Sequence, residues 1–222
     1  MGSDKNNPIV SGAYPTLAHE FQHLVNFNQT YNVEHDTVVM DNWLNEALSL
    51  AAEDMIYGSQ TDRITYVNNN TAIRDGRSLI DWNTANSDIV ANYSLSYLFS
   101  QYLRTQIDQA AGDGEGVLSY KSIIEDPAEN YVAVENVIKD KIDPNLTFAQ
   151  FMTNFRAAML LKADSGPYGF NNESGFDTII TPTYTGTGTT LKGGGAVVKS
   201  INSPFTDPKN GGTNITYLGI YN

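Results

Sequence analysis

The sequence has 222 residues, 41% of them hydrophobic, which is enough for one globular domain or for a domain with an appendage. Its formal net charge of −12 argues against nucleic acid as a partner and against a basic helix on a membrane surface. The absence of cysteine excludes disulfides and thiolate metal ligands, and no apolar run reaches the roughly 18 residues of a transmembrane helix.

The N-terminal residues predict little regular structure. Residues 1–5 (MGSDK) resemble a remnant of an expression vector, so a natural signal peptide would not be visible in this sequence. Residues 6–15 are rich in turn formers, and at most one short strand is expected around Ile9-Val10. The abundance of Asn, Thr, Gly and Tyr favours an extracellular, cell-surface or periplasmic location.

The first strong signal is the pentapeptide His-Glu-Phe-Gln-His at residues 19–23, within a helix predicted over 16–28. Residues four apart lie on one face of a helix, so His19 and His23 could bind a single metal ion. Glu20 could reach a water molecule bound to that ion. The chain has only three histidines, so a chance match that also places this glutamate is improbable. The motif predicts a zinc site.

A second helix is predicted over residues 42–57, after a polar loop at 29–41. Asp41 or Asn42 would be its N-cap residue, and Gly58 would end it. It begins with Trp-Leu-Asn-Glu at 43–46, followed by a small residue and an apolar run. This pattern is typical of the second zinc-binding helix of gluzincin peptidases.

HEFQHLVNF followed by WLNEALSLAAED resembles the hyicolysin-type secreted bacterial metallopeptidases, within the gluzincin group that includes thermolysin. The resemblance is specific over residues 15–55 and looser over 88–104. It implies that Glu46 is the third zinc ligand and that Glu53 lies near the site. It also implies a zincin-like fold, in which a twisted sheet precedes the first metal helix. Only 18 residues precede His19, so this sheet is expected to be largely missing.

Other third ligands can be weighed against Glu46. A metzincin would place a third histidine six residues after His23, but Gln29 stands there. Asp36 and Asp41 remain as carboxylate alternatives, although no supporting motif surrounds them. His35 lies in a polar loop and is expected to be solvated.

Residues 59–87 are polar and irregular, with a possible short strand or helix near 63–67 and with Trp82 packed on the core. Residues 88–111 predict a long helix, because apolar side chains recur at intervals of three and four. In the hyicolysin-type group this helix often brings a tyrosine to the zinc, where a phenol could stabilise an oxyanion. Tyr93 is the candidate and Tyr97 the reserve, although both could equally be core aromatic residues.

The remainder of the chain predicts three helices and a tail. The helices are expected at 116–126, 129–142 and 146–163, the last capped near Asn145 or Thr147. Their large side chains are expected in the core, namely Tyr131, Phe148, Phe151, Phe155 and Met159. Residues 167–222 are predicted to form a β-rich tail or the start of a following β domain, with a strand at 214–221. A turn at 207–212 could bind calcium, but an ordinary surface turn is favoured.

These expectations combine into an α+β, mainly helical fold, with a zincin-like (thermolysin-type) catalytic region at 1–166 and the β-rich tail at 167–222. The expected activity is that of a monomeric zinc-dependent endopeptidase acting on peptide or protein substrates. His19, His23 and Glu46 would hold one zinc, Glu20 would be the general base, and Tyr93 would stabilise the oxyanion. The alternative is a non-catalytic module stapled by zinc, or an inactive peptidase fragment. The intact Glu20 disfavours it, because a structural zinc site needs no general base.

Overall fold

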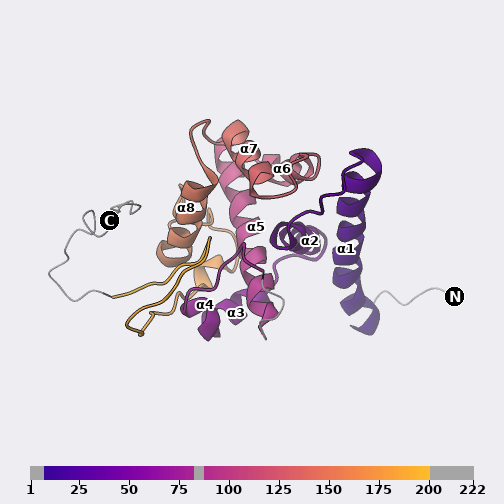
Figure 1. Ribbon diagram of the computed structural model, residues 1–222. Helices are drawn as coiled ribbons and strands as arrows, with labels where there is room; N and C mark the ends of the chain where they lie inside the picture. Colours follow the sequence, from indigo (N-terminus) through magenta and orange to yellow (C-terminus); the bar gives the residue numbers. More distant parts are fainter. Residues whose placement is uncertain (1–7, 83–87, 201–222) are drawn as a thin grey trace.

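The computed structural model describes residues 8–82 and 88–200, with side chains from residue 13 onward. Helices dominate this part of the chain (Figure 1). They are α1 (Pro8–Asn28), the π-helical turn η1 (Gln29–Val33), α2 (Asn42–Tyr57), α3 (Thr61–Asn69), α4 (Thr71–Arg74), α5 (Ile89–Ala111), α6 (Glu115–Ile124), α7 (Tyr131–Lys141), α8 (Phe148–Leu161) and the short 3-10 turn η2 (Phe176–Thr178). None of the helices in the described ranges has the length and apolar character needed to cross a membrane.

Helix α5 is the centre of the fold. In Figure 1 it runs through the middle of the molecule, with α2 and then α1 on one side and α8 on the other. Phe99 of α5 is 1% exposed, and its ring packs against Trp43 of α2 and against three phenylalanines of α8, namely Phe148, Phe151 and Phe155. Edge-to-face contacts of this kind join the two sides of the molecule through one side chain.

Helix α2 lies between α1 and α5 and is apolar on its buried sides. Its predicted boundaries are confirmed: Asp41 precedes it, and Gly58 ends it with a φ of +86° that favours glycine. Asp41 does not cap the helix with its side chain, and its carboxylate accepts instead from the indole N–H of Trp43 at 3.3 Å. The burial of Trp43, Leu44 and Leu48 fixes the orientation of α2, and therefore of the polar residues between them.

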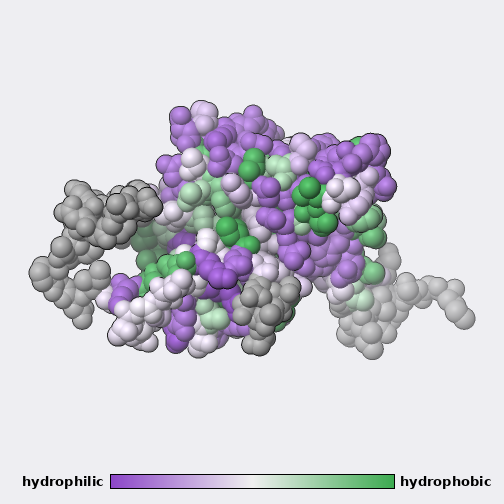
Figure 2. Space-filling view, in the orientation of Figure 1, coloured by the Kyte–Doolittle hydropathy of each residue, from purple (hydrophilic) through white to green (hydrophobic). Residues whose placement is uncertain are grey.

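Helix α1 differs from its prediction in two ways. It begins at Pro8 rather than at residue 16, so the short strand expected around Ile9-Val10 is wrong, and Pro15 lies inside the helix. The two faces of α1 are also the reverse of those of an ordinary surface helix, with the apolar face turned outward and the polar face turned toward α2. The side chains that face outward are apolar, with exposed fractions of 55–66%: Leu17, Phe21, Leu24 and Phe27. In Figure 2 hydrophobic residues are visible at the right-hand edge, where α1 lies.

The side of α1 that faces α2 is polar instead. It carries His19, Gln22, His23 and Asn26, which contact α2 or one another through hydrogen bonds. The described ranges contain no strand that covers the outer face of α1. Helix α1 is therefore attached to the rest of the molecule by polar contacts more than by apolar burial.

The three C-terminal helices agree with their predictions to within two residues at each end. The capping of α8 is a reciprocal box, in which Thr147 accepts from the Gln150 backbone N–H and the Gln150 side chain accepts from the Thr147 N–H. Phe148, Phe151, Phe155 and Met159 are buried as expected. Tyr131 is 46% exposed and does not belong to the core, because it is the first residue of α7 and lies at the edge, where its ring contacts Phe148.

The tail differs from the β-rich prediction over the residues described. Between 167 and 200 the chain forms η2 and one isolated bridge between Thr183 and Val198, and no strand. Apart from the Tyr184 N–H to Val198 O bond at this bridge, several of its backbone groups are hydrogen-bonded to helix side chains. Asn68 pairs with Thr178 O and Ile180 N–H, and Arg156 donates to Gly194 O. The strand predicted at 214–221 and the turn at 207–212 lie outside the described residues.

Because Phe99 joins α2 to α8, its truncation should destabilise the whole domain. We expect Phe99→Ala to lower the free energy of unfolding by about 3–5 kcal/mol. Urea unfolding followed by circular dichroism would measure the change. The control is Leu118→Ala, which removes a side chain that is 61% exposed and should change stability by less than about 0.5 kcal/mol. Equal effects of the two substitutions would contradict the central position of Phe99.

Candidate metal centre

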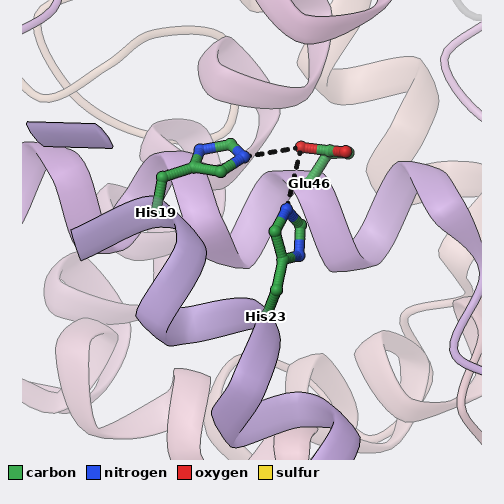
Figure 3. Close-up of side chains that lie close together, drawn as sticks. All are labelled: His19, His23 and Glu46. Atoms are coloured by element: carbon green, nitrogen blue, oxygen red, sulfur yellow. Dashed lines mark ion pairs between the residues drawn. The ribbon is translucent and has the colours of Figure 1, made fainter. Parts of the chain in front are cut away.

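Three side chains from α1 and α2 meet at one point (Figure 3). The Nε2 atoms of His19 and His23 lie 3.0 and 3.6 Å from Oε2 of Glu46. Together they are the only group of three His, Cys, Asp or Glu residues, within the described ranges, whose ligand atoms all fall within 4.8 Å of one another. The helical repeat places the two histidines one turn apart, and the packing of α2 brings Glu46 to both.

The chemistry of this group fits a divalent metal. The Glu46 Oε2 atom is buried and has no hydrogen bond of acceptable geometry, although two imidazole nitrogens are close to it. Two neutral imidazole lone pairs and a carboxylate oxygen would repel one another, so the arrangement calls for a positive charge between them. One carboxylate and two imidazoles are a zinc donor set that leaves a further position open.

The Nδ1 atom of each imidazole has a hydrogen-bond partner. Glu53 Oε1 lies 2.6 Å from His19 Nδ1, and Asn45 Oδ1 lies 2.9 Å from His23 Nδ1. With Nδ1–H donating to these acceptors, the Nε2 atoms of His19 and His23 present lone pairs toward Glu46. Such outer hydrogen bonds fix the orientation of the rings.

Asn45 is held in turn by a chain of amides. Its Oδ1 accepts from Asn26 Nδ2 at 2.6 Å, and Asn26 Oδ1 accepts from Gln22 Nε2 at 2.8 Å. The resemblance implied Glu53, but Asn45 and Asn26 were not identified from the sequence as supporting residues. The spacing in the sequence could have identified Asn26, because it lies three residues after His23 and therefore on the same helical face. In the structure its side chain is 2% exposed.

The electrostatics of His19 reflect its two carboxylate neighbours. Burial lowers the pKa of His19, but the neighbouring carboxylates of Glu46 and Glu53 outweigh it and raise the pKa to about 9. Without metal, the imidazole therefore holds a proton at neutral pH. A metal ion has to displace this proton, so metal affinity should fall as the pH is lowered.

The sequence also named Glu20 and Tyr93 as candidate catalytic residues. Glu20 is exposed and follows His19 directly. The Tyr93 ring is 6.5 Å from the His19 ring, 5.3 Å from Trp82, and under the guanidinium of Arg63 at 5.6 Å. Burial and the negative charge of Glu46 raise the pKa of Tyr93, so its phenol keeps its proton at neutral pH. Arg63 is a further residue at this site that the sequence did not indicate.

The remaining candidates from the sequence lie elsewhere. Tyr97 is fully buried, donates to Asp54 Oδ2 at 2.7 Å and accepts from Gln60 N–H at 2.9 Å. His35 is exposed, as expected, and Asp36 Oδ1 accepts from two backbone N–H groups of its own loop. Asp41 is bonded to Trp43. The structure thus separates Tyr93, which is near the ligand atoms, from Tyr97, which supports the fold.

A polar cleft of about 500 Å³ opens next to Glu53 and Arg63. Its walls come from the end of α2, from α3 and from the start of α5, and include Glu53, Gln60, Asp62, Arg63, Tyr66 and Val90. Two of its lining residues also contact the candidate site, because Glu53 is bonded to His19 and the Arg63 guanidinium lies over the Tyr93 ring.

The geometry predicts a graded response of zinc affinity to substitution. We expect about one zinc per wild-type chain, loss of tight binding in Glu46→Ala, and a roughly 10–100-fold loss in Glu53→Gln, which only perturbs a ligand. Elemental analysis after dialysis and a competitive chelator titration would measure these values. Unchanged affinity in Glu46→Ala would show that the third ligand lies elsewhere.

Comparison with known proteins supports a metal-dependent role. No family model matches the chain. Over 221 residues, the chain is 41% identical to a protein of Staphylococcus hyicus named neutral metalloprotease ShpI. The alignment covers 99% of this chain and 49% of that protein, so the chain spans about half the length of the relative it matches. Along nearly its entire length, therefore, the chain is similar to part of a bacterial metalloprotease, and this supports a relationship with metallopeptidases.

Proposed function

We propose that the chain carries the catalytic centre of a secreted zinc-dependent endopeptidase of the gluzincin type. The observation that carries the proposal is the meeting of His19, His23 and Glu46, with Glu20 next to the first ligand. The 41% identity to a neutral metalloprotease supports it. The proposed substrate is a peptide or protein, and the proposed active form is a monomer.

The residues divide into ligands, a base and a hydrogen-bond donor. His19, His23 and Glu46 would hold the zinc, which when bound supplies an acidified water and polarises the scissile carbonyl. Glu20 accepts the proton released from the attacking water and delivers it to the leaving amine. Its exposed position beside His19 leaves its carboxylate accessible to both water and substrate.

Tyr93 is proposed to stabilise negative charge on the carbonyl oxygen. Its raised pKa keeps the phenol protonated, as a donor requires. Trp82 and the Arg63 guanidinium pack on the ring and hold it in place, so little reorganisation is needed during the reaction. The cleft beside Arg63 and Glu53 is the proposed binding surface for one side of the substrate.

The rival reading, a zinc-stapled module without catalysis, is less well supported. A structural zinc usually has four protein ligands in a closed site. Within the described residues, only three such donor atoms come within 4.8 Å of one another. A three-ligand set with a glutamate and a protonated phenol at its edge favours catalysis.

Substitution of the proposed base should separate metal binding from catalysis. We expect Glu20→Gln to retain zinc and to lose peptide cleavage by about 10²-fold or more, because the amide cannot accept the proton from water. Cleavage of an unfolded protein substrate and zinc content would be measured on the same preparation. Undiminished cleavage would remove Glu20 from the mechanism.

Substitutions of Tyr93 and Tyr97 by phenylalanine should separate a catalytic role from a structural one. Tyr93→Phe should lower turnover by roughly 10²-fold and leave stability nearly unchanged, because it removes a donor to the oxyanion. Tyr97→Phe should lower the free energy of unfolding by about 1–3 kcal/mol and leave the turnover of the folded enzyme unchanged, because it leaves Asp54 without its partner. Kinetics on a short peptide and thermal unfolding would be compared. Wild-type turnover in Tyr93→Phe would assign this residue to packing alone.

A further inference from the structure

The side chain of Arg63 differs from those of the other arginines in the described ranges. Each of the others donates hydrogen bonds to protein acceptors, namely Arg74, Arg77, Arg104 and Arg156. The guanidinium of Arg63 donates to none of the described residues, and it takes part in none of the ion pairs that they form. Because a guanidinium carries donors and no acceptor, its N–H groups are left to water or to a bound ligand.

Arg63 is nevertheless held in a defined place. Its side chain is half-buried, and its guanidinium carbon lies 5.6 Å from the centroid of the Tyr93 ring, which Trp82 contacts at 5.3 Å. A guanidinium over an aromatic face can still present its N–H groups to a planar acceptor such as a carboxylate. The contact with Tyr93 therefore positions the positive charge without neutralising it.

Arg63 contributes both to the polar cleft and to the surroundings of the candidate metal centre. It lines the cleft of about 500 Å³ together with Glu53, whose Oε1 atom lies 2.6 Å from His19 Nδ1. The Tyr93 ring that it covers is 6.5 Å from the His19 ring. An extended peptide advances by about 3.3–3.6 Å per residue, so a group roughly one to three residues from a bond held at the metal centre could reach Arg63.

The cleft also contains two carboxylates, and neither is paired with Arg63. Glu53 is bonded to His19, and Asp62 is exposed in the first turn of α3, where the helix dipole favours a negative charge. Arg63 is the one cation among the residues that line the cleft. Because Glu53 and Asp62 repel an acidic ligand, a carboxylate that enters the cleft is expected to bind only at the guanidinium.

We propose that Arg63 is a specificity-determining residue that binds a carboxylate of the substrate. The carboxylate belongs either to an acidic side chain close to the scissile bond or to the C-terminus of a short peptide, because both present the same planar pair of oxygens. A neutral amide of the same shape cannot form charge-assisted hydrogen bonds and binds less tightly. This inference rests on the proposed peptidase function, and it names the substrate class that the same site prefers.

The test compares peptides that differ in one carboxylate. An internal series has both ends blocked and carries Glu or Gln at each position near the cleaved bond. A terminal pair has a neutral sequence that ends in a free carboxylate or in an amide. We expect kcat/KM of the zinc-loaded chain to be about tenfold higher for the carboxylate member of at least one pair, mainly through KM. The series that shows the preference identifies the source of the carboxylate.

Substitution of Arg63 should remove this preference. Arg63→Gln should lower the ratio of the two kcat/KM values to about one, and Arg63→Lys, which keeps the charge but not the planar fork, should retain part of it. The ratio is taken within one variant, so a general loss of turnover through Tyr93 cancels. Arg74→Gln is the matched control, because it removes a guanidinium that pairs with Asp75 on α4 and does not line this cleft. It should keep the wild-type ratio.

Peptide binding to zinc-loaded Glu20→Gln separates this inference from the proposed function. Calorimetry with the same peptide pairs measures affinity without cleavage. A tenfold preference in binding, with no cleavage by the wild type, would support the role of Arg63 and contradict the proposed function. Cleavage at equal rates for both members of every pair, or an unchanged ratio in Arg63→Gln, would overturn the inference and leave the peptidase function standing. Equal or absent binding of both members of every pair would overturn it as well.

Discussion

The unfavourable meeting of three electron-rich atoms between α1 and α2 is the constraint on which this half of the molecule depends. Two imidazole nitrogens and the Glu46 oxygen converge within 4.8 Å, and this is stable only with a proton or a metal ion among them. The residues around them follow from this requirement. Glu53 and Asn45 hold the histidine rings, and Asn26 holds Asn45.

The same constraint explains the unusual helix α1. Its inner face carries the two histidines and the amides that bond to α2, so it cannot also supply the apolar surface that usually fastens a helix to a core. Helix α2, in contrast, is anchored by apolar side chains. It buries Trp43, Leu44 and Leu48, and so provides a rigid support against which the polar face of α1 is aligned. The alignment of the three candidate ligands therefore comes from the packing of α2 on α5, although two of the candidates belong to α1.

Prediction from the sequence was effective where the information is local. The spacing of His19 and His23 and the boundaries of α2, α5 and α8 follow from helical periodicity and capping residues. Glu46 required the resemblance, because its distance from His23 in the sequence carries no geometric information. Tyr93 and Tyr97 are four residues apart on one helix, so periodicity alone could not separate them; their partners Glu46 and Asp54 do so in three dimensions.

Prediction failed where contacts with residues far away in the sequence determine the secondary structure or the role of a side chain. The segment 167–200 has short alternating stretches, but side chains of α3 and α8 take up its backbone groups, so no β-ladder forms there. The early start of α1 was hidden by Pro15, which usually marks the beginning of a helix rather than its interior. Asn26 and Arg63 were missed because each acquires its role from a residue on another helix.

The outward apolar stripe of α1 has a consequence for the behaviour of the protein as a solute. Leu17, Phe21, Leu24 and Phe27 remain more than half exposed, and each retains roughly 1.5–3 kcal/mol of transfer free energy that burial would release. Salts that are excluded from protein surfaces, such as sulfate, strengthen this driving force. The high net negative charge opposes close approach of chains at low ionic strength, but salt screens it. Colloidal stability should therefore depend on this stripe, and buffers of low ionic strength without sulfate should keep the chain dispersed best.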